Sequence, residues 1–400
     1  MRLLVPATIL AIAGVAAARA DQIDYNQLIA TEGLAGAEDS LAALPAPTPS
    51  DDFALGGVRF LRAAELALQT RYAVNMTGMA EQSGLPFLRL PIGENPDAEP
   101  FEPAMVAQLF EDALVTLEAS REALDRIGDD DAVAVVIDTA VLWFDINSNG
   151  TRDAGEGLFE VAGGDLNRAL AGGFTPPVVR FDTADAAWLS AYAHLLSGMS
   201  ETILALDPTT AIARVLDSAA AMETLGQGMQ QRGWVTGDDA MWVDLIAIFI
   251  HAIEGQPDAD RSRAAHAHFL DVIEDNQVFW SRVAAETDND REWIPNKSQT
   301  SALPITFPPE TGDLWRQVLA DADAMLRGEQ LIPHWRLRGD AGIDLAALMQ
   351  NPPEIDIIGL FQGETILPYA QVGRRIDGQS LRQFEDLLGG DALLFAVILN

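Results

Sequence analysis

The sequence predicts a mainly α-helical, bundle-like globular fold with long loops. Apolar residues recur at three- and four-residue spacing through most of the chain, which is the pattern of amphipathic helices. Hydrophobic residues make up 48% of the 400 residues and charged residues 21%, so the chain can bury a sizeable core and is not disordered. Most breaks between the helical stretches are short, which favours helices packed against one another.

Two helices are expected in the N-terminal region, residues 21–165. Residues 43–52 contain three prolines within five positions and are expected to be extended and poorly packed. The helical pattern begins at Phe53 and resumes after Pro103, because a first helical turn tolerates proline. The proline-rich residues between these two helices, 84–103, predict a loop.

A second helical region is expected over residues 178–400. Asp182 or Thr183 is a candidate N-cap for a helix that runs to about Leu206. Asp258 or Asp260 opens a later one. The further predicted helices cover residues 209–232, 238–254, 261–286 and 310–327.

The boundary between the two regions is expected at residues 162–177, which are rich in glycine and contain two prolines. A single domain that spans residues 21–400 also fits the same pattern, so the division into two domains stays open. Residues 133–144, shortly before this boundary, are apolar and rich in β-branched side chains, and fit either a strand or a helix.

The first twenty residues have the three-part layout of a secretory signal peptide. Arg2 precedes an apolar stretch, and small residues lead up to a predicted cleavage site after Ala20. This layout predicts a periplasmic or secreted protein. No later run approaches the ~18 uninterrupted apolar residues that a membrane span needs.

Charge and cysteine content narrow the classes of partner and cofactor. The formal net charge is −35, and such a surface repels nucleic acid and anionic lipid, which we exclude as partners. The chain has no cysteine, which excludes disulfides, iron–sulfur clusters, thioether-linked haem and thiolate zinc sites.

An acidic twelve-residue loop is the most specific motif in the chain. It reads Asp-Ile-Asn-Ser-Asn-Gly-Thr-Arg-Asp-Ala-Gly-Glu, from Asp145 to Glu156. A Ca²⁺ ion prefers about six to eight oxygen ligands, which a loop of this length supplies from alternate positions and a final glutamate. Gly150 stands where the chain must turn sharply. The predicted ligands are Asp145, Asn147, Asn149, Thr151 through its backbone carbonyl, Asp153 and Glu156.

These twelve residues resemble an EF-hand-type calcium loop. Paired EF-hands carry an apolar residue at position 8, whereas this chain has Arg152 there and no second loop of the pattern. The loop is therefore more similar to the solitary Asp-x-Asn-x-Asn-Gly-x-x-Asp-x-Gly-Glu loops of exported bacterial proteins. Only three ligands carry charge, which predicts a structural Ca²⁺ bound with a Kd on the order of 10⁻⁴–10⁻³ M.

Histidine and glutamate side chains offer an alternative metal site. His251 and Glu254 are one helical turn apart, and His266 and His268 follow on the next predicted helix, although on different faces. The His-x-x-Glu spacing is similar to a motif of imelysin-like proteins, which are exported, helical and of comparable length. The resemblance implies metal handling by His251 and Glu254. The glycine that precedes the histidine by two residues in that motif is absent.

The sequence therefore favours an exported calcium-binding helical protein that acts in binding or in upkeep of the cell envelope. The alternative is a metal-dependent enzyme or imelysin-like metal-handling protein built on His251 and Glu254. A third class, a carbohydrate-active enzyme, requires two facing carboxylates, for which the acid-rich segments 238–239 and 286–292 are candidates. No residue is assigned a catalytic role.

Overall fold

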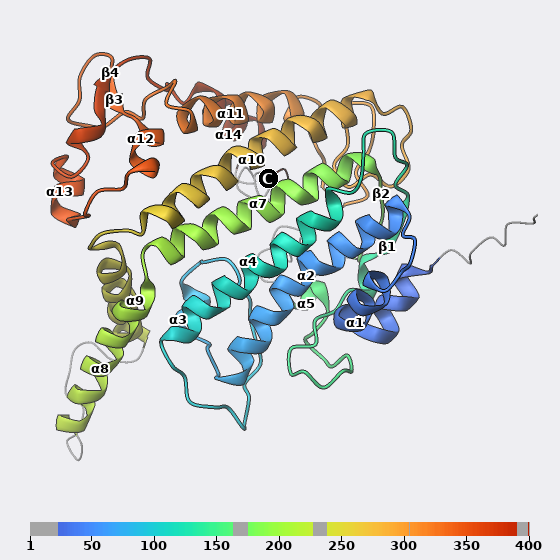
Figure 1. Ribbon diagram of the computed structural model, residues 1–400, viewed down its shortest axis with the longest axis horizontal. Helices are drawn as coiled ribbons and strands as arrows, with labels where there is room; N and C mark the ends of the chain where they lie inside the picture. Colours follow the sequence, from blue (N-terminus) through green and yellow to red (C-terminus); the bar gives the residue numbers. More distant parts are fainter. Residues whose placement is uncertain (1–22, 163–174, 227–237, 304, 390–398, 400) are drawn as a thin grey trace, which may run out of the picture.

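The structure, a computed structural model, confirms the mainly helical fold (Figure 1). It describes residues 23–162, 175–226, 238–303, 305–389 and 399. The predicted signal peptide, residues 1–20, and most of the predicted boundary segment lie outside these residues.

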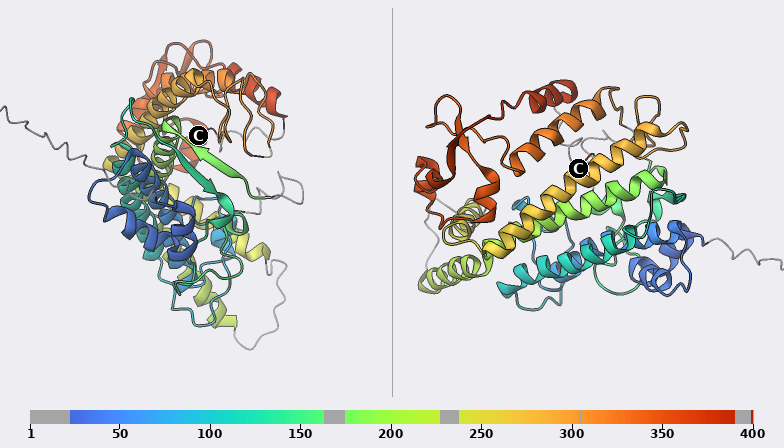
Figure 2. Two further views of the ribbon diagram at one scale, coloured as in Figure 1. Left: turned by 90° about the vertical axis from the view of Figure 1, so that its right-hand side faces the viewer. Right: turned by 45° about the horizontal axis from the view of Figure 1, so that its top comes forward.

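Seven helices form a row in which each packs against the next (Figures 1 and 2). Four long helices, α2, α4, α7 and α10, lie side by side at its centre, with α1 at one end and α11 and α14 at the other. The row consists of α1 (Tyr25–Ala42), α2 (Pro49–Ala73), α4 (Ala104–Leu124), α7 (Thr183–Ala205), α10 (Ala259–Ala285), α11 (Thr311–Leu326) and α14 (Gln379–Leu388).

The remaining elements are short or lie at the ends of this row. Helices α8 and α9 pack against each other below one end of α7 in Figure 1, and β3 and β4 form a small antiparallel pair near α12 and α13. These elements are α3 (Met79–Gln82), α5 (Leu158–Val161), α8 (Pro208–Gly226), α9 (Asp238–Ile253), α12 (Leu345–Gln350), α13 (Ile357–Gln362), β3 (Ala341–Ile343), β4 (Ala370–Val372) and the 3-10 turn η2 (Leu367–Tyr369).

Local capping explains where the central helices begin. The Asp182 carboxylate accepts a hydrogen bond from the Ala184 N–H at the start of α7, as predicted. The Asp258 carboxylate caps α10 in the same way. The expectation of an extended segment over residues 43–52 is wrong at its C-terminal end. Thr48 forms a capping box with Asp51, and Pro49 occupies the first turn of α2.

Helix α1 was not predicted from the sequence. Its residues pack in one core with those of α2, α4 and β1, where Leu34 is only 1% exposed. Gly33 interrupts it with φ 66°, and a Cβ there would lie 3.0 Å from the ring of Trp143. This kink breaks the helical periodicity that would otherwise have marked the helix.

Residues 133–144 contain a strand rather than a helix. β1 (Val135–Asp138) pairs antiparallel with β2 (Val178–Phe181), with Val135 opposite Phe181, and a 3-10 turn, η1 (Thr139–Val141), follows β1. The pair joins chain segments from both sides of residues 162–177, and α7 packs against both α4 and α10. In the part of the chain that the structure describes, no helix is both long and apolar enough to cross a membrane.

Candidate metal sites

The acidic loop is closed at its two ends by backbone hydrogen bonds. The Phe144 N–H donates to the Glu156 carbonyl over 2.8 Å, and the Leu158 N–H donates to the Leu142 carbonyl over 3.0 Å. A β-bridge joins Trp143 and Gly157 between them. The loop is thus entered from β1 and η1 and left through the short helix α5, so the helix–loop–helix arrangement of an EF-hand is not present around it.

The first half of the loop folds around the Asp145 carboxylate. Its two oxygens accept hydrogen bonds from the backbone N–H groups of Asn149 and Gly150, both over 2.9 Å. Gly150 has φ 74° and Ser148 φ 58°, so two residues of the turn adopt the left-handed conformation. The predicted sharp turn at Gly150 is therefore confirmed.

Backbone N–H groups of the loop hold the Glu156 carboxylate in place. The Ile146 N–H donates to one of its oxygens over 3.0 Å, and the Asp153 N–H donates to the other over 2.7 Å. Only 4% of Glu156 is exposed. A carboxylate oxygen accepts about two hydrogen bonds or metal contacts, so each oxygen of Glu156 keeps a second acceptor position.

The remaining predicted ligands bond to one another. The side-chain amides of Asn147 and Asn149 both donate to one oxygen of Asp153, over 2.8 and 2.7 Å. The Asn149 side-chain oxygen accepts from both the N–H and the hydroxyl of Thr151. The carboxylate oxygens of Asp145, Asp153 and Glu156 do not all lie within 4.8 Å of one another. All six predicted ligands lie on the loop, but a cation would require Asp153 or its neighbours to turn inward.

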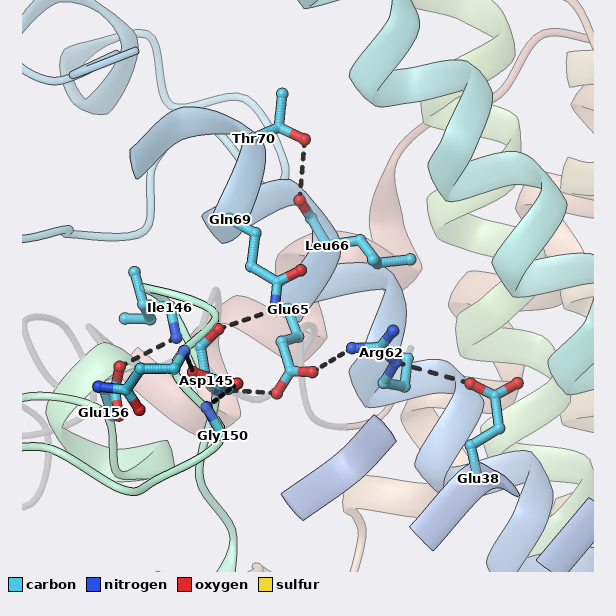
Figure 3. A network of polar contacts seen from close by, with 11 residues as sticks. Glu38, Arg62, Glu65, Leu66, Gln69, Thr70, Asp145, Ile146, Gly150 and Glu156 are labelled. Carbon is cyan, nitrogen blue, oxygen red and sulfur yellow. Dashed lines mark hydrogen bonds and ion pairs between the residues drawn. The ribbon is translucent and has the colours of Figure 1, made fainter. Parts of the chain in front are cut away.

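Side chains of α2 hold the loop against the helical row (Figure 3). One oxygen of Glu65 accepts from the Asp145 N–H over 2.9 Å, and Gln69 donates to the Asp145 carbonyl over 2.8 Å. The other Glu65 oxygen pairs with Arg62, which also faces Glu38 of α1. Glu65 is 1% exposed, and burial is the main cause that raises its pKa. No sequence motif near the loop marks these contacts with α2, so they were not predicted.

Arg152, at position 8 of the loop, makes a contact that differs from the one expected in paired EF-hands. Its guanidinium donates to the Ala140 carbonyl over 2.9 Å, so the side chain at position 8 folds back onto η1. An apolar residue at this position would instead serve contact with a second loop. The side chain at position 8 is thus engaged by the turn that precedes the loop.

His251 and Glu254 lie side by side, but neither His266 nor His268 joins them in a metal-binding group. His251 Nδ1 is 3.8 Å from a Glu254 oxygen and 3.4 Å from the Arg214 guanidinium. His266 is engaged by the Leu326 carbonyl and the Gln350 side chain. Among the described residues, no third His, Asp or Glu completes a metal-binding group with His251 and Glu254.

His268 instead meets His194, a residue that the sequence did not single out. The two Nδ1 atoms are 2.8 Å apart, and His194 Nδ1 is 3.6 Å from an Asp271 oxygen. Burial, with the nearby Arg121 guanidinium, lowers the pKa of His194 to about 3 and that of His268 to about 4. Both rings are therefore neutral at pH 7.

Three carboxylates gather where α7 begins and α10 ends. Oxygens of Asp182, Glu286 and Glu292 lie within 4.8 Å of one another. Asp182 caps α7, and Glu292 accepts a hydrogen bond from the Asp290 N–H. Burial raises the pKa of Glu286 to about 7, and the neighbouring carboxylates raise it as well. The acid-rich segment 286–292 thus faces another carboxylate instead of lying wholly in solvent.

This raised pKa predicts a pH-dependent stability. Between a pH of about 4.5 and 7 the folded chain retains a proton on Glu286 that the unfolded chain releases, so the free energy of unfolding falls as pH rises. Glu286→Gln keeps an acceptor for the Gln299 amide, which donates over 3.0 Å. We expect it to gain about 1 kcal/mol relative to the parent at pH 8 and little at pH 4.5. Urea unfolding at both values measures the difference, and an equal effect at both, as for the exposed control Glu329→Gln, contradicts it.

Comparison with protein-family models, with curated proteins and with solved structures finds no match for this chain.

Proposed function

We propose that this chain is an exported protein in which the loop from Asp145 to Glu156 binds one Ca²⁺ ion as a structural staple, and that it acts in binding or upkeep of the cell envelope. Export is supported by the signal-like layout of residues 1–20. The net charge of −35 supports the absence of nucleic acid and anionic lipid among its partners.

The observation that carries the calcium proposal is the preorganisation of the first and last ligands. Backbone N–H groups already orient both oxygens of Asp145 and both oxygens of Glu156. Each of these oxygens retains an acceptor position for a hard cation, which prefers carboxylate and carbonyl oxygen.

A bound cation would complete the loop by replacing its internal bonds. Asp153 now accepts hydrogen bonds from the neutral side-chain amides of Asn147 and Asn149. A dication would attract the Asp153 carboxylate more strongly and free the asparagines to turn their oxygens inward. This rearrangement costs part of the binding energy, which agrees with a Kd on the order of 10⁻⁴–10⁻³ M.

Calcium titration of the chelator-treated protein tests the proposal. Isothermal calorimetry is expected to show one site, which Asp145→Ala and Glu156→Gln each remove. The control Glu329→Gln takes away one exposed carboxylate just after α11, which α4, α7 and α10 separate from the loop's support α2, and should leave binding unchanged. Equal binding by the parent, Asp145→Ala and Glu156→Gln would overturn the proposal.

A further inference from the structure

We propose a second metal site, for a divalent transition ion of the Zn²⁺ class, formed by His194 of α7 with His268 and Asp271 of α10. The ligand atoms of the three side chains lie within 4.8 Å of one another. The site is separate from the acidic loop and differs from it in chemistry, because two of its three ligands are imidazole nitrogens.

Two long helices hold these side chains in place. His268 and Asp271 are three residues apart on α10 and therefore share one face of that helix. His194 reaches them from α7, which packs along α10. Gly198 allows a close approach beside the site, since a Cβ there would lie 2.7 Å from the ring of Phe269. Ligands on packed helices keep their spacing better than ligands on loops.

The spacing of the ligand atoms fits coordination at one ion. Zn–N and Zn–O bonds of about 2.0–2.2 Å place neighbouring ligand atoms roughly 3.0–3.5 Å apart. The Nδ1–Nδ1 separation is 2.8 Å and the His194 Nδ1–Asp271 Oδ2 separation is 3.6 Å. Shifts of a few tenths of an ångström, about what a side-chain torsion provides, would bring these two pairs to that spacing, and the His268 and Asp271 ligand atoms lie within 4.8 Å of each other.

The contact between the two imidazole rings is compatible with metal binding after a change of tautomer. Two imidazole lone pairs would repel at 2.8 Å, so one ring carries its proton on the facing nitrogen. Metal binding requires that proton to move to Nε2 of the same ring, after which both Nδ1 lone pairs are donated to the ion. The step changes a tautomer and releases no net proton.

The charge around the pair favours a dication. Among the described residues, the cation that acts on both rings is the Arg121 guanidinium, which donates to Ser197 over 2.7 Å and pairs with Glu118. Carboxylates outnumber it around the site: besides Asp271 itself, Glu118 acts on His268, and Glu274 and Asp275 interact with Asp271. Such an excess of negative charge lowers the free energy of a bound Zn²⁺.

One side of the site is open to solvent. The Asp271 side chain is 47% exposed, whereas that of His194 is 16% exposed. An ion can therefore enter past Asp271, and water can fill the coordination positions that the protein leaves free. Imidazole ligands select zinc and related ions over calcium, which takes oxygen ligands.

Zinc titration of the full chain, without a histidine tag and in millimolar calcium, tests this site. Calorimetry is expected to show one equivalent of Zn²⁺. His194→Gln and His268→Gln should abolish binding, and Asp271→Asn should weaken it by at least about tenfold. Because Asp271 is half exposed, Asp271→Asn keeps the test valid even if a histidine variant fails to fold.

Two controls separate this site from the other candidates. His251→Gln should bind zinc like the parent, and Glu156→Gln should lose calcium but keep zinc, so failure of the calcium proposal would not be mistaken for failure here. The zinc site is overturned if the parent binds no Zn²⁺, if Asp271→Asn and the folded histidine variants retain parental affinity, or if His251→Gln loses the equivalent.

Discussion

Glu65→Ala is expected to lower the free energy of unfolding by about 3 kcal/mol and to weaken calcium binding by about tenfold. The substitution removes a buried carboxylate that pairs with Arg62 and accepts the Asp145 N–H. Among the described residues, Arg62, whose side chain is 15% exposed, would then keep only Glu38, 3.6 Å away, as a charged partner. The calcium effect rests on the proposed function. It arises because Asp145, the first ligand, loses the bond that anchors it to α2.

Conservative replacement separates the two effects of Glu65. Glu65→Gln retains an acceptor for the Asp145 N–H but loses the charge that pairs with Arg62. We expect it to recover most of the calcium affinity while it remains less stable than the parent in chelator. Thermal unfolding with chelator and with calcium, together with calorimetry, distinguishes the outcomes. A parental calcium Kd in Glu65→Ala would show that α2 does not position the loop.

Sequence-local features account for the parts of the fold that were predicted. Asp182 and Asp258 cap helices through their own side chains, so the signal lies within a few residues of the helix start. Helix α1 was missed because Gly33 bends it and shifts the apolar positions out of a single period. The three prolines of residues 43–52 predict an extended segment, whereas the last of them, Pro49, occupies the first turn of α2, where its missing N–H costs nothing.

The candidate sites also differ in how far apart their residues lie along the sequence, and this decides which of them could be predicted. The acidic loop could be located from the sequence because its predicted ligands follow one another over twelve residues, and its internal hydrogen bonds are equally local. The contact that anchors the loop to α2 could not be located in this way, because Glu65 precedes Asp145 by 80 residues. His194 and His268 are 74 residues apart, and only the packing of α7 on α10 brings them together. The alternative built on His251 and Glu254 rested on spacing within one helix, and spacing cannot show whether His266 or His268 of the next helix lies against it.

The segment after α2 depends on the buried guanidinium of Arg71. Removing this guanidinium should give the largest loss in the free energy of unfolding. Arg71 is fully buried and donates to the backbone carbonyls of Met76, Phe87 and Leu90, so one side chain satisfies three carbonyls that no regular element supplies with donors. Burial lowers its pKa to about 10, and Glu81 lies 3.6 Å away. Arg71→Met retains an apolar stem but leaves these carbonyls without donors, and should cost about 3–5 kcal/mol.

Denaturant unfolding followed by circular dichroism measures this loss, with Arg263→Met as the matched control. The Arg263 side chain is 42% exposed, and both its pair with Asp260 and its hydrogen bond to the Gln350 carbonyl lie at the surface, so its removal should change the unfolding free energy by less than about 0.5 kcal/mol. Arg71→Lys should fall between the two, because an ammonium group keeps a charge but cannot span three carbonyls as a planar guanidinium does. If Arg71→Met and Arg263→Met unfolded at the same denaturant concentration, residues 76–90 would owe their conformation to apolar packing around Phe87 and Leu88, and not to the guanidinium.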